Sequence, residues 1–349
     1  MKTTKTTMNK KGTVRSLKVA EWPAADRLAW EEACRPSIRL ARGGLASHLK
    51  PVTRDDLAKR YGLFLDYVYR SRGLEAGAQA ACSVLPEYVS DYIAELKGRV
   101  RSVTCYGNIY KLRRMAELLS PRRDFGWLRG LEQELCFAMR PAAKFRRIVD
   151  SDRLVAAGIA LMTEAQGAPH WTKLRRARAY RNGLMVALLA CAPIRLKNFT
   201  DLSIGRTLIR NKNRWWICLP AKDTKNGRPD ERPMPKFLTI YIDQYLNTFR
   251  PVLGTSGQHL WVSSGGGPLS YIACERIVTE TTRQTVGTPI CPHLFRSCAA
   301  STAALYKGDE PNLASALLQH TDRTVTEQHY NRARASSYAR AFASLIEAL

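Results

Sequence analysis

A tyrosine near the end of the chain has the chemistry and the polar setting of a phosphoryl-transfer nucleophile. Tyr330 follows His320 by ten residues and lies in the strongly polar segment 328–332. A phenol can attack phosphorus and form an ester that is later reversed, and nearby positive charge would activate it by lowering its pKa from about 10. An isolated tyrosine more often packs on a core, but the polar neighbours of Tyr330 weaken that interpretation.

Two arginines upstream could neutralise the negative charge that such an attack builds up on phosphate oxygens. Arg195 and Arg296 carry guanidinium groups, which match phosphate oxygens in pairs and stay charged at working pH. Arg195 follows an apolar helical stretch and Pro193, so we expect it where a buried helix ends, and a charge there needs a partner. The structural alternative is an ion pair with Asp201, six residues further on.

Proton transfer would fall to a lysine and two histidines. Lys225 lies in the turn segment 223–227, from which it could protonate a leaving oxygen; Lys222 is a rival, and a solvated surface lysine is the alternative. His293 and His320 could carry protons or donate hydrogen bonds to phosphate, although a single histidine is more often structural.

Neither a metal nor another cofactor is predicted. The histidines His293, His320 and His329 lack carboxylate or cysteine partners at ligand spacing. The glycine-rich loop at 263–268 lacks the lysine and the strand-to-helix context of a nucleotide-binding loop. We therefore expect chemistry carried by side chains alone.

Apolar periodicity predicts the elements that would position these residues. Between residues 53 and 135, apolar side chains recur at helical spacing in four stripes, which indicates a small all-helical domain. After a connector at 141–150, helices are predicted over 153–163 and 178–191, followed by a β-hairpin over 207–219. The predicted fold is mainly α with a small β-sheet, divided into a basic arm at 1–40, a helical domain at 41–145 and a mixed α+β domain at 146–349.

Composition favours a polyanionic partner. The 349 residues carry a formal net charge of +25, and nucleic acid binding is the simplest reason to tolerate such self-repulsion. No apolar run approaches the roughly 20 residues that span a bilayer. The nine cysteines include no C-x-x-C pair, so we expect no disulfide framework and a reducing, cytoplasmic compartment.

A dense cationic run precedes the helix that leads to Arg195. Its members are candidate phosphate contacts, and a solvated helix face is an equally good interpretation. The run contains Lys173, Arg175, Arg176 and Arg178.

In their order and spacing, the candidate residues resemble the active site of the tyrosine recombinase (phage integrase) family. The matching set is Arg195, Lys225, His293, Arg296, His320 and Tyr330. The resemblance covers roughly residues 150–349 and implies a helical core-binding domain and a catalytic domain that clamp double-stranded DNA. It further implies a 3′-phosphotyrosyl intermediate formed without metal or ATP, and a homotetramer acting on two DNA sites. A nucleoid-associated protein of a mobile element, with accessory DNA-bending partners, would fit this family.

Some positions depart from the commonest family pattern. Asn198 stands where an acid usually follows the first arginine, Gln319 replaces a glycine, and Ser297 replaces a frequent histidine. None of these changes removes a catalytic group. The tail at 333–349 has apolar residues at helical spacing, and it could dock on its own domain or, as in the family, on a neighbouring subunit.

Four other functions are alternatives. A type IB topoisomerase would relax supercoils with the same residues, and a telomere resolvase would use them as well. A catalytically silent relative would bind DNA as an accessory protein. The complete set of six residues favours an enzyme over the silent relative. A metal-dependent nuclease is disfavoured because the sequence shows no carboxylate cluster.

Overall fold

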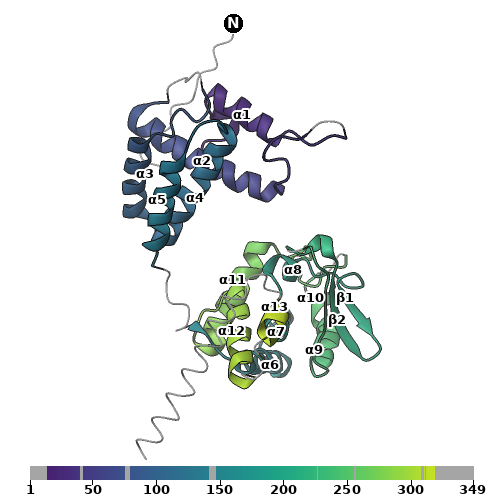
Figure 1. The fold of residues 1–349 in the computed structure, drawn as a ribbon. Coiled ribbons are helices and arrows are strands. Elements are labelled where there is room, and N and C mark those ends of the chain that lie inside the picture. Colours follow the sequence, from purple (N-terminus) through teal and green to yellow (C-terminus); the bar gives the residue numbers. More distant parts are fainter. Residues whose placement is uncertain are drawn as a thin grey trace, which may run out of the picture. The chain divides into compact units, whose positions relative to one another are not determined.

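The computed structural model describes residues 14–39, 42–74, 79–140, 147–225, 227–254, 257–307, 310 and 312–318. The chain divides into two compact units, Met1–Ala142 and Ala143–Leu349, and Figure 1 shows the elements of each. Each unit has its own hydrophobic core. No helix in the described part of the chain is long and apolar enough to cross a membrane.

The first unit is a bundle of helices. Its elements are η1 (Val19–Glu21), α1 (Ala24–Cys34), α2 (Pro51–Arg72), α3 (Pro86–Arg99), α4 (Ser102–Leu119) and α5 (Gly126–Phe137). The long helix α2 starts with a proline, whose missing N–H costs nothing in a first turn, and it ends at Gly73, which has a φ of 80°. Helix α4 packs against both α2 and α5.

Aromatic rings fill the core of the first unit. Trp22 meets Tyr61 edge-on at 5.0 Å between ring centroids, and Phe64 meets Tyr92 at 5.4 Å. The buried Asp26 accepts hydrogen bonds from the Tyr61 hydroxyl at 2.8 Å and from a backbone N–H. Since Leu17 and Trp30 also belong to this core, the packed unit begins inside the range 1–40 that was expected to be a basic arm.

The second unit combines helices with a small sheet. It contains α6 (Ser151–Gly167), α7 (Lys173–Cys191), α8 (Leu196–Thr200), β1 (Leu208–Asn211), β2 (Arg214–Leu219), η3 (Ala221–Asp223), β3 (Asp230–Pro233), α9 (Leu238–Gln244), η4 (Tyr245–Phe249), α10 (Arg250–Val252), α11 (Tyr271–Val286), α12 (Pro292–Tyr306) and α13 (Leu313–Leu318). The predicted mainly α fold with a small β-sheet is confirmed.

Helices α6 and α7 form the centre of this unit. Their backbones approach closely where Gly158 faces Gly183, because a Cβ at either position would lie 2.6 Å from the carbonyl oxygen of the other. Helix α7 is buried almost all round from Tyr180 to Ala190. This rigid, apolar helix leads directly to the segment that carries Arg195.

The sheet is antiparallel, with β2 between β1 and β3. Helix α9 is tied to it, because the Trp215 indole N–H donates to Asp243 at 2.8 Å. In the pairing of β2 with β3, Ile217 stands opposite Arg232, and Leu219 stands opposite Asp230. Ile217 is fully buried, so β3 contributes charged residues at the edge of the core.

Candidate active site

Arg195 is the N-cap residue of the short helix α8, two residues after a buried proline. Helix α7 ends at Cys191, and the buried link of Ala192, Pro193 and Ile194 leads to Arg195 at the N-cap position. Arg195 itself is half-buried. The predicted position at the end of a buried helix is therefore where the structure places it.

Arg296 lies on α12 and is only 6% exposed. Its Nη1 donates to the Pro193 carbonyl at 2.7 Å, and its Nη2 donates to the carbonyl of Leu318. These bonds join α12 to the segment before Arg195 and to the end of α13. The two predicted arginines are far apart in sequence, and the fold brings their segments together.

The electrostatic surroundings of Arg296 are strongly positive. Burial and, after it, the nearby charges of Arg195 and Arg232 lower its pKa to about 10, against the opposing effect of Asp230. A lowered pKa means that the protein disfavours the charged form, and a guanidinium stays charged at working pH nevertheless. An anion bound beside these groups would relieve that cost.

Asp230 and Arg232 are site residues that sequence reasoning missed. The Nε and Nη2 atoms of Arg232 donate to the two carboxylate oxygens of Asp230 at 2.7 and 2.8 Å. Both side chains are only 11% exposed. Their spacing of two residues places both on one face of a strand, and this spacing can be read in the sequence.

Arg195 has no carboxylate partner in the part of the chain that the structure describes. The proposed alternative, Asp201, instead pairs with Lys197 at 3.0 Å, and both of these side chains are exposed. Arg296 likewise has carbonyl acceptors and no ion pair among the described residues. Of the three guanidinium groups, only that of Arg232 has a carboxylate partner among the described residues, and this excess of positive charge favours anion binding.

The proton-transfer candidates differ in position. His293 lies on α12 one turn before Arg296 and is exposed. Lys225 is exposed between η3 and β3, next to Thr224, whose buried hydroxyl donates to the Arg228 carbonyl at 2.7 Å. Each therefore presents its side chain to solvent beside a segment that is anchored in the fold.

The rival Lys222 lines a pocket of about 330 Å³, together with Asn198 and residues of both charges. His320, Tyr330, Gln319 and the tail at 333–349 lie outside the described residues, so the structure does not test their predicted roles. Among the described residues, no group of three or more His, Cys, Asp or Glu side chains is arranged to hold a metal ion.

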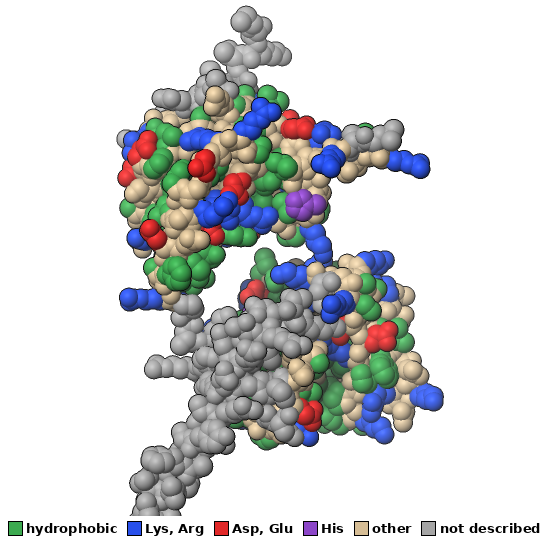
Figure 2. Space-filling view, in the orientation of Figure 1, with side chains coloured by type: hydrophobic (Ala, Val, Ile, Leu, Met, Phe, Trp, Pro, Cys, Tyr) green, Lys and Arg blue, Asp and Glu red, His purple; other side chains and the backbone are tan. Residues whose placement is uncertain are grey.

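The four cationic residues of α7 have different surroundings. Arg176 donates to the carbonyls of Ala165 and Gln166, so it caps the end of α6. Arg175 stacks over the Trp171 ring at 4.2 Å, while Arg178 donates to the Ser264 hydroxyl at 2.6 Å. Lys173 is exposed. On the face shown in Figure 2, Lys and Arg side chains are dispersed over both units.

Comparison with curated proteins finds tyrosine recombinases. The chain is 29% identical over 98 residues to tyrosine recombinase XerC of Staphylococcus haemolyticus (strain JCSC1435), a match that covers 28% of this chain and 33% of that protein. It is 26% identical over 106 residues to tyrosine recombinase XerC of Staphylococcus saprophyticus, covering 30% and 36%. The chain thus matches about a third of the length of these relatives, and no family model matches it.

The structural comparison covers nearly the whole chain. The crystal structure of the XerH site-specific recombinase bound to its difH substrate, in a pre-cleavage complex, matches with a TM-score of 0.59 at 11% identity. The match covers 92% of this chain and 98% of that one. At this identity the likeness shows a shared fold, and the sequence matches support the family that the motifs predicted.

Proposed function

Because the chain is related in sequence to the tyrosine recombinases and shares their fold, we propose that it is a site-specific DNA recombinase. One observation carries this proposal: Arg195 and Arg296 meet at a largely buried site, and neither has a carboxylate partner among the described residues. A buried charge without a partner is costly, and a phosphodiester supplies the missing negative charge.

The proposed reaction is a transesterification. The Tyr330 oxygen attacks phosphorus, the bond from phosphorus to the 5′ oxygen breaks, and a 3′-phosphotyrosyl bond replaces it. Lys225 gives a proton to the departing 5′ oxygen, and His293 or His320 accepts the proton of the phenol. Arg195 and Arg296 neutralise the two non-bridging oxygens as charge accumulates. The bond energy is conserved in the ester, so the freed 5′ hydroxyl of a partner strand can reverse the step.

The oligomer and the wider DNA contacts complete the proposal. A homotetramer on two DNA sites would exchange strands, with the tail at 333–349 docking on a neighbouring subunit. Arg178, Arg175 and Lys173 are proposed to contact phosphates, whereas Arg176 is already engaged with carbonyls of α6. Deleting residues 336–349 should then spare DNA binding and impair strand exchange.

A nicked duplex tests the central step. Duplexes tiled across the DNA that flanks the gene, each with one nick, let the cut fragment diffuse away and trap the covalent complex. The wild-type protein should form a detergent-resistant adduct in EDTA, and Tyr330→Phe should abolish it. Tyr306→Phe is the matched control, because Tyr306 is 67% exposed at the end of α12.

The other outcomes identify other functions. Wild-type protein that binds one of these duplexes tightly and never forms an adduct is an accessory DNA-binding protein. Protein that forms the adduct and relaxes supercoils without making strand junctions is a type IB topoisomerase. Adduct formation by Tyr330→Phe would show that a different nucleophile acts.

A further inference from the structure

One guanidinium nitrogen at the candidate site is buried and unsatisfied. Asp230 takes the Nε and Nη2 atoms of Arg232, but Nη1 is buried and has no hydrogen-bond partner within the described residues. An unmet buried donor on a charged group costs more than a neutral one. Native proteins keep few such atoms, so each one requires an explanation.

A second unsatisfied guanidinium nitrogen in the described chain shows why Arg232 is unusual. The Nε of Arg60, in the first unit, also lacks a hydrogen bond, but it lies 3.5 Å from the carboxylate of Asp56. The carboxylate next to Arg232, that of Asp230, already accepts hydrogen bonds from the other two nitrogen atoms of its guanidinium group. Its neighbours Arg195 and Arg296 are positively charged, so no further negative charge is available to Nη1 from this cluster.

We propose that Arg232 is a third guanidinium of the anion site, with its Nη1 donating to a non-bridging oxygen of the phosphodiester that Arg195 and Arg296 bind. The two non-bridging oxygens of a phosphodiester have several lone pairs, so they can accept hydrogen bonds from three guanidinium groups better than a single-atom anion such as chloride can. The identity of the anion as a phosphodiester rests on the proposed function. The existence of the anion site does not, and it can be tested without DNA.

Asp230 has a positioning role in this proposal. It lies two residues before Arg232 on the same strand, and β2 fixes the register of both residues by pairing. Asp230 accepts hydrogen bonds from Nε and Nη2 of Arg232 and thereby fixes the direction of Nη1 before the anion binds. It also offsets one of three positive charges, which lets the arginines stay close together when the site is empty.

The anion site is tested with inorganic phosphate. Thermal unfolding of the full chain is followed as phosphate replaces chloride at constant ionic strength, for wild type, Arg232→Gln and Arg210→Gln. Arg210 is a matched control, because it lies on β1 in an exposed ion pair with Asp243 and its loss changes the net charge equally. Arg232→Gln should weaken phosphate binding by roughly ten- to hundred-fold, and Arg210→Gln should leave it unchanged.

A second variant protects this test against misfolding. Arg232→Lys keeps the charge and loses the fork, so phosphate affinity should fall by a smaller factor than in Arg232→Gln. Wild-type phosphate affinity in either folded variant would overturn the proposal. Equal stabilisation of the wild type by phosphate and by chloride would overturn it as well, because no anion site would then exist.

Contact with the scissile phosphate is tested by chemical substitution in the nicked duplex. A methylphosphonate at the cleaved position, used as each stereoisomer, replaces one charged oxygen with a methyl group. On the natural duplex, wild type should form the adduct faster than Arg232→Gln. With the isomer that lacks the oxygen contacted by Arg232, the ratio of the two rates should move toward one, because neither protein can make that contact. A ratio that stays the same for both isomers and the natural duplex marks a purely structural residue and overturns the proposal.

The two arms separate this proposal from the proposed function. If phosphate binds through Arg232 and the wild-type protein forms no adduct with any duplex, the anion site stands and the recombinase assignment fails. If adduct forms and Arg232→Gln changes neither phosphate affinity nor the methylphosphonate ratio, the recombinase assignment stands and this proposal fails.

Discussion

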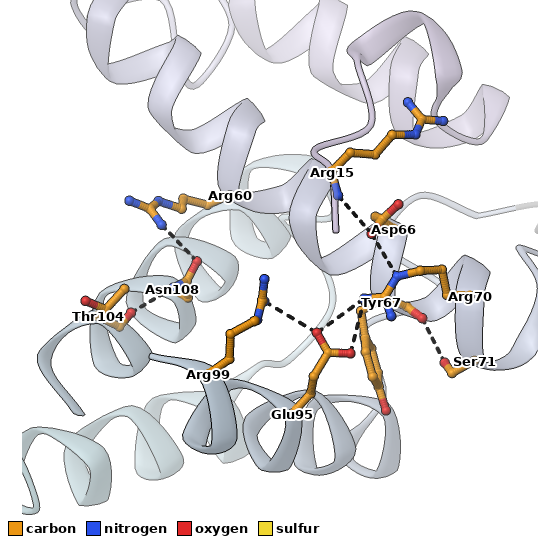
Figure 3. A network of polar contacts seen from close by, with 10 residues as sticks. All are labelled: Arg15, Arg60, Asp66, Tyr67, Arg70, Ser71, Glu95, Arg99, Thr104 and Asn108. Atoms are coloured by element: carbon orange, nitrogen blue, oxygen red, sulfur yellow. Dashed lines mark hydrogen bonds and ion pairs between the residues drawn. The ribbon is translucent and has the colours of Figure 1, made fainter. Parts of the chain in front are cut away.

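Two arginine clusters, one in each unit, differ in how far carboxylates balance their charge. In the first unit, Arg70 donates to Asp66 at 2.9 Å and to Glu95 at 3.1 Å, and Arg99 joins the same glutamate. Figure 3 shows this network of shared carboxylates. In the candidate site of the second unit, Arg232 pairs with Asp230, and neither Arg195 nor Arg296 has a carboxylate partner among the described residues. Carboxylates balance the arginines of the first cluster, whereas the second cluster has more guanidinium groups than described carboxylate partners.

The pKa values of two arginines express this difference. Burial lowers the pKa of Arg70, but its hydrogen bonds with Asp66 and Glu95 outweigh burial and raise it above the ordinary value. Burial, together with the charges of the neighbouring Arg195 and Arg232, lowers the pKa of Arg296 to about 10. The first arrangement serves stability. The second costs stability and is the kind of local conflict expected at a functional site.

The largest effect should follow the loss of a guanidinium fork at the candidate site. Arg296→Lys keeps a charge but loses paired donation to phosphate, so the rate of adduct formation should fall by about 10² to 10³. Rates are measured on the nicked duplex well below the melting temperature of each variant. The control is Arg250→Lys, since Arg250 is also buried and donates to the carbonyls of Gly257 and His259.

Arg250→Lys should lower stability and leave the rate per folded molecule unchanged. This pair of variants therefore separates a buried arginine that only holds backbone from one that also meets the anion. If folded Arg296→Lys cleaves DNA at the wild-type rate, Arg296 has only a structural role, and the contrast drawn between the arginines of the two units does not hold.

Breaking the balanced network of the first unit should cost stability and spare chemistry. The Asp66 side chain is only 4% exposed, and Asp66→Asn removes its negative charge. Arg70, whose side chain is 32% exposed, then loses one ion pair and keeps the other with Glu95. We expect the free energy of unfolding to fall by about 1–2 kcal/mol, a range reduced for the exposure of the arginine. Denaturant unfolding checks this value, with Glu31→Gln as an exposed control expected within about 0.5 kcal/mol of wild type. Equal effects of the two changes would mean that the network contributes little.

Sequence reasoning recovered many of the elements and missed part of the charge balance. The spacing of apolar residues predicted the helices of the first unit and the helices α6 and α7, but it did not predict α11 or β3. The position of Arg195 after an apolar helix predicted where it would lie. Arg232 was missed because β3 has only four residues, too short for alternation to stand out from a turn. Its partner Asp230 and its place opposite Ile217 depend on strand register, which side-chain spacing alone does not determine.

The same limit explains the assignments in the cationic run of α7. Arg176 and Arg178 are two residues apart in the cationic run and carry the same charge. One reaches back to the carbonyls at the end of α6, and the other reaches Ser264 from an exposed position. That distinction depends on how α6 and α7 pack, because the run itself contains no signal that separates them.

A smaller effect should distinguish these two arginines in DNA binding. Arg178→Gln should weaken binding to any duplex and reduce the slope of log affinity against log salt by about 0.9, as expected for one lost phosphate contact. Arg176→Gln should leave that slope unchanged and lower the free energy of unfolding by about 1 kcal/mol, because two carbonyls lose their donor. Titrations at several salt concentrations measure the slope. A reversal of the two slopes would place the phosphate contact at Arg176.

The smallest effect should come from the exposed ion pair beside the candidate site. Lys197 and Asp201 lie 3.0 Å apart at i and i+4, with side chains 78% and 54% exposed. Such pairs contribute about 0.5 kcal/mol or less. Asp201→Asn should therefore change the free energy of unfolding by no more than about 0.5 kcal/mol, and the rate of adduct formation by no more than about two-fold. A larger loss of adduct would mean that Asp201 serves Arg195 during the reaction, and the charge at this site would then be balanced from within, as in the first unit.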